Sequence, residues 1–214
     1  MTKKQLALEV IERLKNEYPA SDCTLDYDEA WKLLVSVRLA AQCTDARVNE
    51  IVPKLYEKYP TVEALANAGA DAIEEIVKPC GLGKSKARDI AACMQVLHEK
   101  YGDMVPEDFD ELLALPGVGR KSANLIVGDV FKKPAIVTDT HCIRLSNRIG
   151  LVDDVKEPYK VEMALRKIVP PEEGNDLCHR LVDHGRAVCT ARTMPYCDRC
   201  VLADICKAHK KGKY

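Results

Sequence analysis

The sequence lacks the features of a membrane-spanning or exported chain. No apolar run approaches the roughly 18 to 20 residues that a transmembrane helix requires. The start, Met1-Thr2-Lys3-Lys4, leads into an amphipathic pattern and not into the apolar core of a secretory signal. With 214 residues, 47% of them hydrophobic, the chain is long enough for one or two ordinary globular domains. We therefore expect a soluble protein of the cytoplasm that has no membrane partner.

Net charge is also nearly absent, at −1 for 32 basic and 33 acidic residues. This total averages unlike parts, because residues 113–150 carry a net +4 and residues 178–214 a net +5, which leaves −10 for the rest. Polarised charge of this kind fits a protein with one basic face, for which a phosphate backbone is a natural partner. A solvated surface with chance clustering would give the same totals, so charge alone does not decide.

Strand-like alternation is nearly missing, and the short apolar stretch Ala135-Ile136-Val137, after Pro134, is expected to be an extended linker. Apolar residues at helical spacing recur along the chain instead. They occur in residues 6–14, 31–39, 87–97 and 161–168. The pattern predicts an all-α fold.

A proline–glycine turn interrupts one of these helical patterns. Apolar positions in residues 109–113 and 123–131 predict a short helix and a longer one, with Pro116-Gly117-Val118-Gly119 between them. Glycines in such a turn permit positive φ and close backbone approach, and Val118 can fix the turn in the core. The predicted unit is a helix–hairpin–helix.

The start of the second helix is a predicted anion site. After Gly117, Val118 and Gly119, the helix N-terminus offers unpaired N–H groups and the positive end of its dipole. Arg120 and Lys121 add positive charge at the same place. A hairpin of this type alone indicates binding of a phosphate backbone without reading of its sequence. On that interpretation Lys121 is only another phosphate contact.

A weaker copy of the turn lies upstream. Residues 80–90, CGLGKSKARDI, align with residues 116–126, PGVGRKSANLI, at a constant offset of 36 residues. The shared pattern of two glycines, a basic residue, an alanine and an isoleucine favours two related units over a coincidence of glycine turns. Ser85 stands in the first copy where Lys121 stands in the second.

Lys121 and Asp139 are the candidate catalytic residues. The helix dipole opposes an ammonium group in the first turn by roughly 0.3–1 kcal/mol, and partial burial would disfavour the charged form further. A neutral amine is the form that a nucleophilic lysine needs. Asp139, in Thr138-Asp139-Thr140-His141, opens another predicted helix and suits an N-cap, so capping alone is the alternative role for it.

Ten cysteines are many for a reducing compartment, where disulfides do not persist. Four of them lie in one short C-terminal segment: Cys189, Cys197, Cys200 and Cys206. Structural zinc sites usually use two Cys-x2-Cys pairs or Cys/His pairs, whereas this segment has one such pair and wider gaps. A [4Fe-4S] cluster held by four thiolates is therefore favoured over zinc.

The remaining cysteines are scattered and are expected to fill the core: Cys23, Cys43, Cys80, Cys93, Cys142 and Cys178. Two arginines, Arg192 and Arg199, lie inside the C-terminal cysteine segment. They either oppose thiolate charge or face a phosphate, and the sequence does not separate these roles.

The motif Leu-Pro-Gly-Val-Gly-Arg-Lys, the motif Thr-Asp-Thr-His and the four C-terminal cysteines together resemble the endonuclease III family. This is the family of bifunctional DNA glycosylase/AP lyases within the helix–hairpin–helix glycosylases. The resemblance covers essentially the whole chain, including residues 41–45 and 81–83. Three departures stand out: the first cysteine gap has seven residues where the family usually has six, Ala40 replaces a common Ser, and Thr138 replaces a usual Val. None removes a catalytic or ligand group.

The resemblance implies two α-helical domains with a DNA-binding cleft between them. Residues 23–133 would form a six-helix barrel that contains the helix–hairpin–helix. Residues 1–22 and 134–214 would form a second helical domain that carries a [4Fe-4S] cluster. The implied partner is double-stranded DNA with damaged pyrimidines or abasic sites, bound by a monomer.

The same resemblance implies the chemistry. A damaged pyrimidine would be flipped out of the duplex. Lys121 would attack C1′ of its sugar to leave a Schiff base, and β-elimination would then cut the strand. Asp139 would help to activate the nucleophile and stabilise positive charge on the sugar. Gln42 would fill the gap left by the flipped nucleotide, and Leu82 would wedge near the orphan base.

Other residues of the implied DNA-contacting set are Gly117, Val118, Gly119, Arg120, His141 and Arg144. Asp45 and His141 match family positions near the site, with roles that stay open. Two alternatives remain. One is a monofunctional mismatch glycosylase of the same superfamily, which differs at the lysine position. The other is a non-enzymatic, cluster-bearing module that binds DNA or senses redox state.

Overall fold

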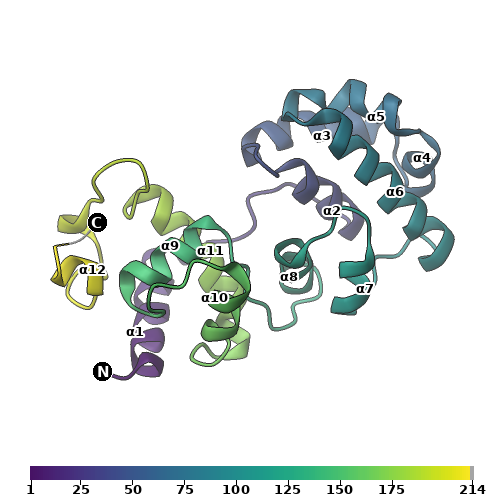
Figure 1. The fold of residues 1–214 in the computed structure, drawn as a ribbon. Helices are drawn as coiled ribbons and strands as arrows, with labels where there is room; N and C mark the ends of the chain where they lie inside the picture. Colours follow the sequence, from purple (N-terminus) through teal and green to yellow (C-terminus); the bar gives the residue numbers. More distant parts are fainter. Residues whose placement is uncertain (213–214) are drawn as a thin grey trace. The chain divides into compact units, whose positions relative to one another are not determined.

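The computed structural model describes residues 1–212, where helices joined by loops are the only regular secondary structure and no strand occurs (Figure 1). The all-α prediction is therefore confirmed. None of the described helices is long and apolar enough to cross a membrane. The chain divides into two compact units. Cys23–Phe131 is called the hairpin unit below, and Met1–Asp22 with Lys132–Tyr214 is called the cluster unit.

The hairpin unit is one continuous segment, and the predicted domain of residues 23–133 extends two residues beyond it. Its helices are α2 (Ala30–Leu39), α3 (Asp45–Lys58), α4 (Val62–Asn67), α5 (Ala70–Val77), the 3-10 turn η1 (Lys78–Cys80), α6 (Gly83–Tyr101), α7 (Phe109–Ala114) and α8 (Arg120–Asp129). These are seven α-helical segments where the family resemblance implies six. Gly69, at φ 75°, separates the two short helices α4 and α5.

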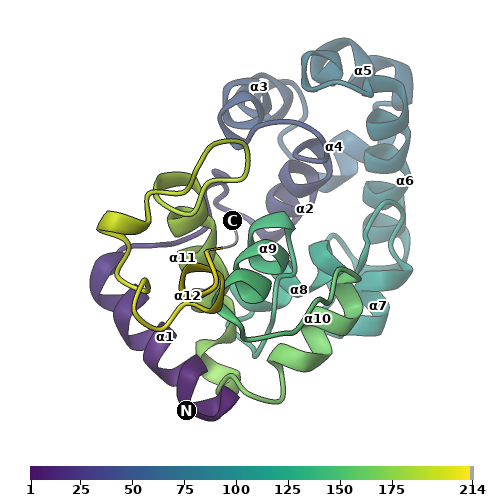
Figure 2. The same cartoon turned by 60° about the vertical axis from the view of Figure 1, so that its left-hand side comes forward.

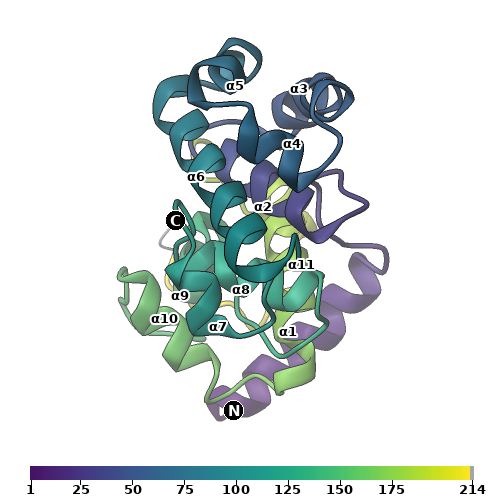
Figure 3. The ribbon, with the colours of Figure 1, turned by 90° about the vertical axis from the view of Figure 1, so that its right-hand side faces the viewer.

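The long helix α6 organises the hairpin unit. Both α4 and α5 lie against it, as Figure 3 shows. Its buried face includes Ala87, Ile90, Met94 and Leu97, at the spacing that the sequence predicted. Helices α2 and α8 pack on one another, and α7 packs on α8. This packing fixes the turns before α6 and α8, which carry the candidate site residues.

The cluster unit is assembled from both ends of the chain. It contains α1 (Lys3–Glu17), α9 (Thr140–Ile149), α10 (Pro158–Leu165), the 3-10 turn η2 (Pro171–Glu173), α11 (Gly174–Ala187), the 3-10 turn η3 (Cys197–Arg199) and α12 (Lys207–Lys210). Helix α11 packs against both α1 and α9, and α12 packs on α9 (Figure 2). The C-terminal cysteine segment therefore lies over helices from two distant parts of the sequence.

The linker before α9 has the extended, non-helical form that the sequence predicted, and it is buried. Ala135, Ile136 and Val137 are each less than 7% exposed, and the Val137 backbone N–H donates to Sγ of Cys178 at 3.2 Å. A Cβ on Gly174 would overlap the carbonyl of Ala135, so a glycine at the start of α11 lets the linker pass close to it. Close packing here fixes the entry to α9.

Candidate functional site

The hairpin connects α7 to α8 in the form that the sequence predicted. The turn closes through a hydrogen bond from the Val118 N–H to the Leu115 carbonyl at 3.1 Å. Gly117 has φ 75°, in the left-handed region. Gly119 is the N-cap of α8 and supplies no side-chain cap. The first N–H groups of α8 are thus left to other acceptors, which is the condition for an anion site at a helix N-terminus.

An ion pair inside the hairpin unit supports the turn. Arg38 on α2 donates from Nε and Nη2 to one oxygen of Asp89 on α6, at 2.9 and 2.6 Å. A Cβ on Gly117 would lie 2.8 Å from Cβ of Asp89, so only glycine allows this approach.

Val118 is half-buried and lines a cavity of about 220 Å³ between α2, α6 and the turn. The guanidinium of Arg120 stacks over the Phe109 ring at 4.9 Å.

Lys121 lies in the first turn of α8 and is exposed. Partial burial, which the sequence analysis considered as one way to disfavour its charge, is therefore absent in this structure. An exposed amine beside an uncapped helix start can reach a molecule that binds the hairpin from outside.

Gln42 and Leu82 share an unusual backbone conformation. They have φ values of 56° and 51°, and among residues 1–212 only three other non-glycine residues have positive φ. Gln42 is exposed in the turn between α2 and α3, and Leu82 is 58% exposed at the N-cap of α6. Left-handed backbone at such residues costs about 1–3 kcal/mol and tends to cluster at functional sites.

The two glycine turns agree at one position and differ at the next. Gly81 and Gly117, which the sequence aligns, have φ values of 73° and 75°. Leu82 is left-handed, but its counterpart Val118 has no positive φ. The upstream turn thus presents its apolar residue to solvent, while the downstream turn keeps Val118 half-buried. The two turns share a glycine geometry but expose different groups.

In the cluster unit, Asp139 is the N-cap of α9. Its Oδ1 accepts from the Cys142 N–H at 2.7 Å, as expected for the capping role. Nη2 of Arg144 donates to the carbonyls of Cys189 and Gly185 at 3.0 and 3.3 Å, and lies 3.2 Å from Nδ1 of His141. Arg144 therefore has a structural role inside the cluster unit, and its contact with DNA stays a prediction.

The remaining predicted residues are Asp45 and the six scattered cysteines. Oδ2 of Asp45, in the first turn of α3, accepts from the Thr24 hydroxyl at 2.6 Å. Four of the six scattered cysteines are buried, which confirms the core-filler interpretation for Cys80, Cys93, Cys142 and Cys178. Cys23 and Cys43 are half-buried, so that interpretation was wrong for them.

The four C-terminal cysteines line one cavity. This cavity has about 410 Å³ of empty space, is open to solvent and lies against α9 and α11. None of the four is in a disulfide, and all four are half-buried. Within the described residues, no three of their sulfurs lie within 4.8 Å of one another. Around a single tetrahedral zinc, thiolate sulfurs stand about 3.8 Å apart, so the wider arrangement fits a larger inorganic core such as a [4Fe-4S] cluster.

Two residues that the sequence analysis missed hold this cavity. Nη1 of Arg148 donates to Sγ of Cys189 at 3.3 Å and to the Thr190 carbonyl at 2.8 Å. The thiol of Cys206 donates to the carbonyl of the same arginine at 3.3 Å. The signal for Arg148 was weak: it lies one helical turn after Arg144, in a basic segment. Its contacts come from residues about 40 to 60 positions away, which periodicity does not predict.

His184 on α11 is the second missed residue. It is buried, and burial lowers its pKa to about 4, so the imidazole is neutral. The Tyr18 hydroxyl lies 3.1 Å from Nδ1, and Sγ of Cys200 lies 3.4 Å from Nε2. If the hydroxyl donates to Nδ1, the ring carries its proton on Nε2 and donates to the sulfur. This chain links α1, α11 and the cysteine segment.

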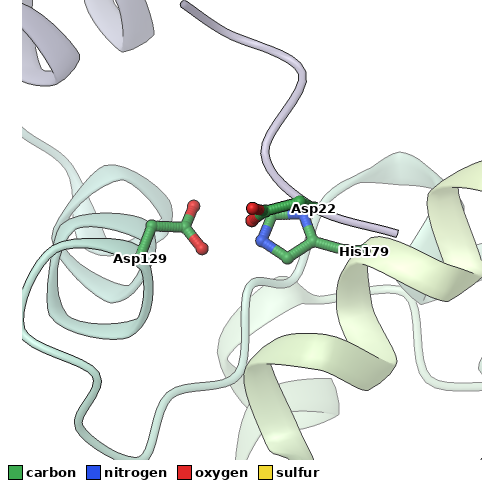
Figure 4. A group of neighbouring side chains, drawn as sticks. All are labelled: Asp22, Asp129 and His179. Carbon is green, nitrogen blue, oxygen red and sulfur yellow. The ribbon is translucent and has the colours of Figure 1, made fainter. Parts of the chain in front are cut away.

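Figure 4 shows two further titratable side chains of the cluster unit, Asp22 and His179. A carboxylate oxygen of Asp22 and a ring nitrogen of His179 lie within 4.8 Å of each other. This pair brings the end of the N-terminal segment next to α11.

Known proteins resemble this chain along nearly its whole length. Residues 35–171 match the family model of the HhH-GPD superfamily base excision DNA repair proteins. Endonuclease III of Synechocystis sp. is 41% identical over 96% of this chain and 93% of its own length. Endonuclease III of Escherichia coli K12 is 38% identical over 97% of this chain and 98% of its own length.

Solved structures of other proteins have the same fold. A trapped covalent intermediate of endonuclease III with DNA superposes with a TM-score of 0.92 at 38% identity and covers 99% of each chain. A thermostable thymine-DNA glycosylase, at 23% identity and a TM-score of 0.85, shares the fold. The chain therefore belongs to the endonuclease III family of the HhH-GPD base excision repair proteins. It is a base excision repair enzyme of the DNA glycosylase/AP lyase type, and the predicted family and activity are confirmed.

Proposed function

We propose that this enzyme removes oxidised pyrimidines from double-stranded DNA as a monomer and cuts the strand at the resulting abasic site, with Lys121 as the nucleophile. The observation that carries the proposal is an exposed lysine in the first turn of a helix whose N-terminus has no side-chain cap. A backbone phosphate held by these N–H groups would bring the adjoining sugar within reach of Lys121.

The hairpin binds the phosphate backbone through Gly117, Gly119 and Arg120. The damaged nucleotide leaves the stack, which costs a few kcal/mol and least for a damaged base. Gln42 fills the space it leaves, and Leu82 wedges beside the orphan base. The exposed, left-handed Leu82 is suited to this role because its side chain is already displayed to solvent before DNA binds.

In the chemical step, neutral Lys121 forms a bond from Nζ to C1′ while the bond from C1′ to the base breaks. The base leaves with the electron pair and takes up a proton. Opening of the sugar ring gives a Schiff base, which lowers the barrier to loss of a C2′ proton. Elimination then breaks the C3′–O bond and leaves a 5′-phosphate on the downstream strand. The carboxylate of Asp139 favours the positive charge that develops on the sugar.

The cysteine segment holds a [4Fe-4S] cluster in this proposal, with Cys189, Cys197, Cys200 and Cys206 as ligands. The bound cluster supplies a rigid core that ties the C-terminal segment together, as metal binding does in small metal-dependent folds. Arg148 would donate a hydrogen bond to the first ligand and His184 to the third. These contacts orient the thiolates and offset part of their negative charge.

The test is covalent trapping. Incubation with abasic duplex DNA and borohydride should reduce the Schiff base and give a stable protein–DNA adduct. Lys121→Ala should abolish the adduct, because no other amine is placed in this turn. The matched control is Lys54→Ala, which removes an exposed lysine on α3 and should trap as well as the parent. Undiminished trapping by Lys121→Ala would refute the assignment.

A further inference from the structure

One lysine of the hairpin unit is completely buried. Lys86, on the first turns of α6, has no solvent exposure. Its Nζ donates to the carbonyl of Leu39 at 2.7 Å and to the carbonyl of Cys80 at 2.8 Å. Burial lowers the pKa of this ammonium group, and the thiols of Cys43 and Cys80 counter part of that effect. The two carbonyls are the partners that hold the amine in place.

These carbonyls mark the bases of two separate loops. Leu39 is the last residue of α2, and the turn after it carries Gln42. Cys80 is the last residue of η1, and the turn after it carries Leu82. One ammonium group therefore joins loops that stand 40 residues apart in the sequence. Burial, with the nearby thiol of Cys43 adding to it, raises the pKa of the Cys80 thiol to about 11, so a thiol from each of the same two loops lies near the other.

Both loops are in conformations that need support. Gln42 and Leu82 are left-handed at φ 56° and 51°. Such residues persist only where the surrounding structure over-determines them. The Lys86 side chain reaches the backbone immediately before each strained turn, at two and three residues from Leu82 and Gln42. It is thus placed to fix where each turn begins.

We infer that Lys86 is a positioning residue that holds the Gln42 and Leu82 loops side by side, so that both side chains enter the DNA stack together. The inference rests on the proposed roles of Gln42 and Leu82. Stability alone does not account for this ammonium group, because an apolar side chain of similar volume is often as good or better in a buried site. Lys86 is not the nucleophile, since its amine is buried and already donates to two carbonyls.

The experiment measures lesion discrimination, defined as affinity for a duplex with a tetrahydrofuran abasic analogue divided by affinity for undamaged duplex. The variants are Lys86→Met, which keeps the stem, and Lys86→Arg, which keeps the charge. Lys100→Met is the matched control, because it removes an exposed lysine from the far end of the same helix. A 2-aminopurine opposite the analogue reports whether the orphan base is disturbed on binding. Circular dichroism checks that each variant is folded.

We expect Lys86→Met to lose about tenfold in discrimination, the scale of one or two charge-assisted hydrogen bonds. Affinity for undamaged duplex and the Lys100→Met control should match the parent. The 2-aminopurine signal should fall in Lys86→Met and recover in Lys86→Arg. In a Gln42→Ala, Leu82→Ala background, Lys86→Met should add no further loss, because its effect acts through those two residues.

The outcomes separate this inference from the proposed function. If Gln42→Ala and Leu82→Ala leave discrimination intact, the insertion roles fail and the inference fails with them. If those variants lose discrimination but Lys86→Met does not, only the role of Lys86 is overturned. Additive losses in the triple variant would also overturn it. Unfolding of both Lys86→Met and Lys86→Arg would assign this lysine to fold stability instead.

Discussion

Lys86 and Lys121 each follow a glycine turn by a few residues, yet their surroundings are opposite. Lys86 is buried and donates to two backbone carbonyls, whereas Lys121 is exposed at the start of α8. A buried amine with a lowered pKa would ordinarily be the first candidate for a nucleophile. Here exposure favours Lys121 as the nucleophile instead, because a reacting sugar can approach only the exposed amine.

Asp139 has two roles that one substitution can separate. Asparagine caps helices about as well as aspartate, so Asp139→Asn should keep the bond to the Cys142 N–H and change stability little. Loss of the carboxylate should nevertheless slow single-turnover base excision by about 10²-fold or more. Asp139→Ala should slow the reaction equally and also lower the unfolding free energy by about 1 kcal/mol. Equal rates for the parent and Asp139→Asn would leave only the capping role.

At the scale of elements, the two glycines of the hairpin differ in backbone conformation and in the space around them. Gly117 is left-handed and a Cβ there would push against Asp89 and Arg38, whereas Gly119 has an ordinary φ of −98° and open space around it. Gly117→Ala should therefore lower the unfolding free energy by about 1–3 kcal/mol. Gly119→Ala should lower it by less, about 1 kcal/mol or below, because alanine is a poorer N-cap than glycine.

The same pair tests the anion site by a second measurement. Urea denaturation gives the stability of each variant, and fluorescence anisotropy gives its affinity for duplex DNA. Gly119→Ala should bind DNA more weakly although it is the more stable variant of the two, because its methyl group occupies the space where a phosphate would approach the α8 N-terminus. Normal binding by this variant would place the phosphate elsewhere.

The cysteine segment gives a prediction about cofactor loading. The purified protein should be yellow-brown with broad absorbance near about 400 nm, as thiolate-held [4Fe-4S] clusters are. Cys197→Ser should lose this absorbance and lower stability, because a ligand and the rigid core are lost together. Cys93→Ser, in the buried core of the hairpin unit, is the matched control and should keep the colour. A colourless parent that contains zinc would contradict the cluster assignment.

Much of the helical framework could be predicted from sequence, because apolar periodicity and caps are local signals. The buried faces of α1 and α6, the cap at Asp139 and the hairpin from Leu115 to Gly119 follow from residues a few positions apart. The division of α4 from α5 was not predicted. It depends on the left-handed Gly69, and a single glycine does not reveal from sequence whether a helix stops there.

Contacts between distant residues were beyond sequence reasoning. From the sequence, Lys86 is expected to be one more charged residue of an amphipathic helix. Nothing local indicates its contact with the carbonyl of Leu39, which lies 47 positions away. Arg148 and His184 likewise acquire their roles only when α9, α11 and the cysteine segment come together. Motif spacing found the groups that perform chemistry, because these cluster in short segments. It missed the groups that hold them in place.

At the scale of the whole chain, one carboxylate joins its two ends. Asp153 accepts from Lys207 on α12 at 2.6 Å and from Lys3 on α1 at 2.7 Å. Hydrogen bonds from Lys207 and then Lys3 lower the pKa of Asp153 to about 2. The folded value lies below the unfolded value of about 3.9. The stabilisation is therefore complete above that pH and is lost as pH falls toward 2.

This contact is a solvent-exposed one, with the Asp153 side chain 59% exposed, so its effect is small. Asp153→Asn should lower the unfolding free energy by less than about 1 kcal/mol at neutral pH. The difference from the parent should shrink as pH falls from about 4 to 2 and as salt rises. Glu172→Gln, an exposed acid on η2, is the control and should show no such pH dependence. A difference that persists at pH 2 would contradict the ion pair.

Because the cluster unit is made of two segments separated by the hairpin unit, its two parts leave the ribosome at different times. Helix α1 is synthesised before the hairpin unit, but the partners of Tyr18 and Ser21 are His184 and Asp183 on α11, which follows that unit. The continuous hairpin unit is complete long before that helix emerges, and domains generally fold as units during synthesis. The nascent chain should therefore carry a folded hairpin unit while α1 still lacks α11, and the cysteines, which follow α11 in the sequence, would receive their iron only after that helix has emerged.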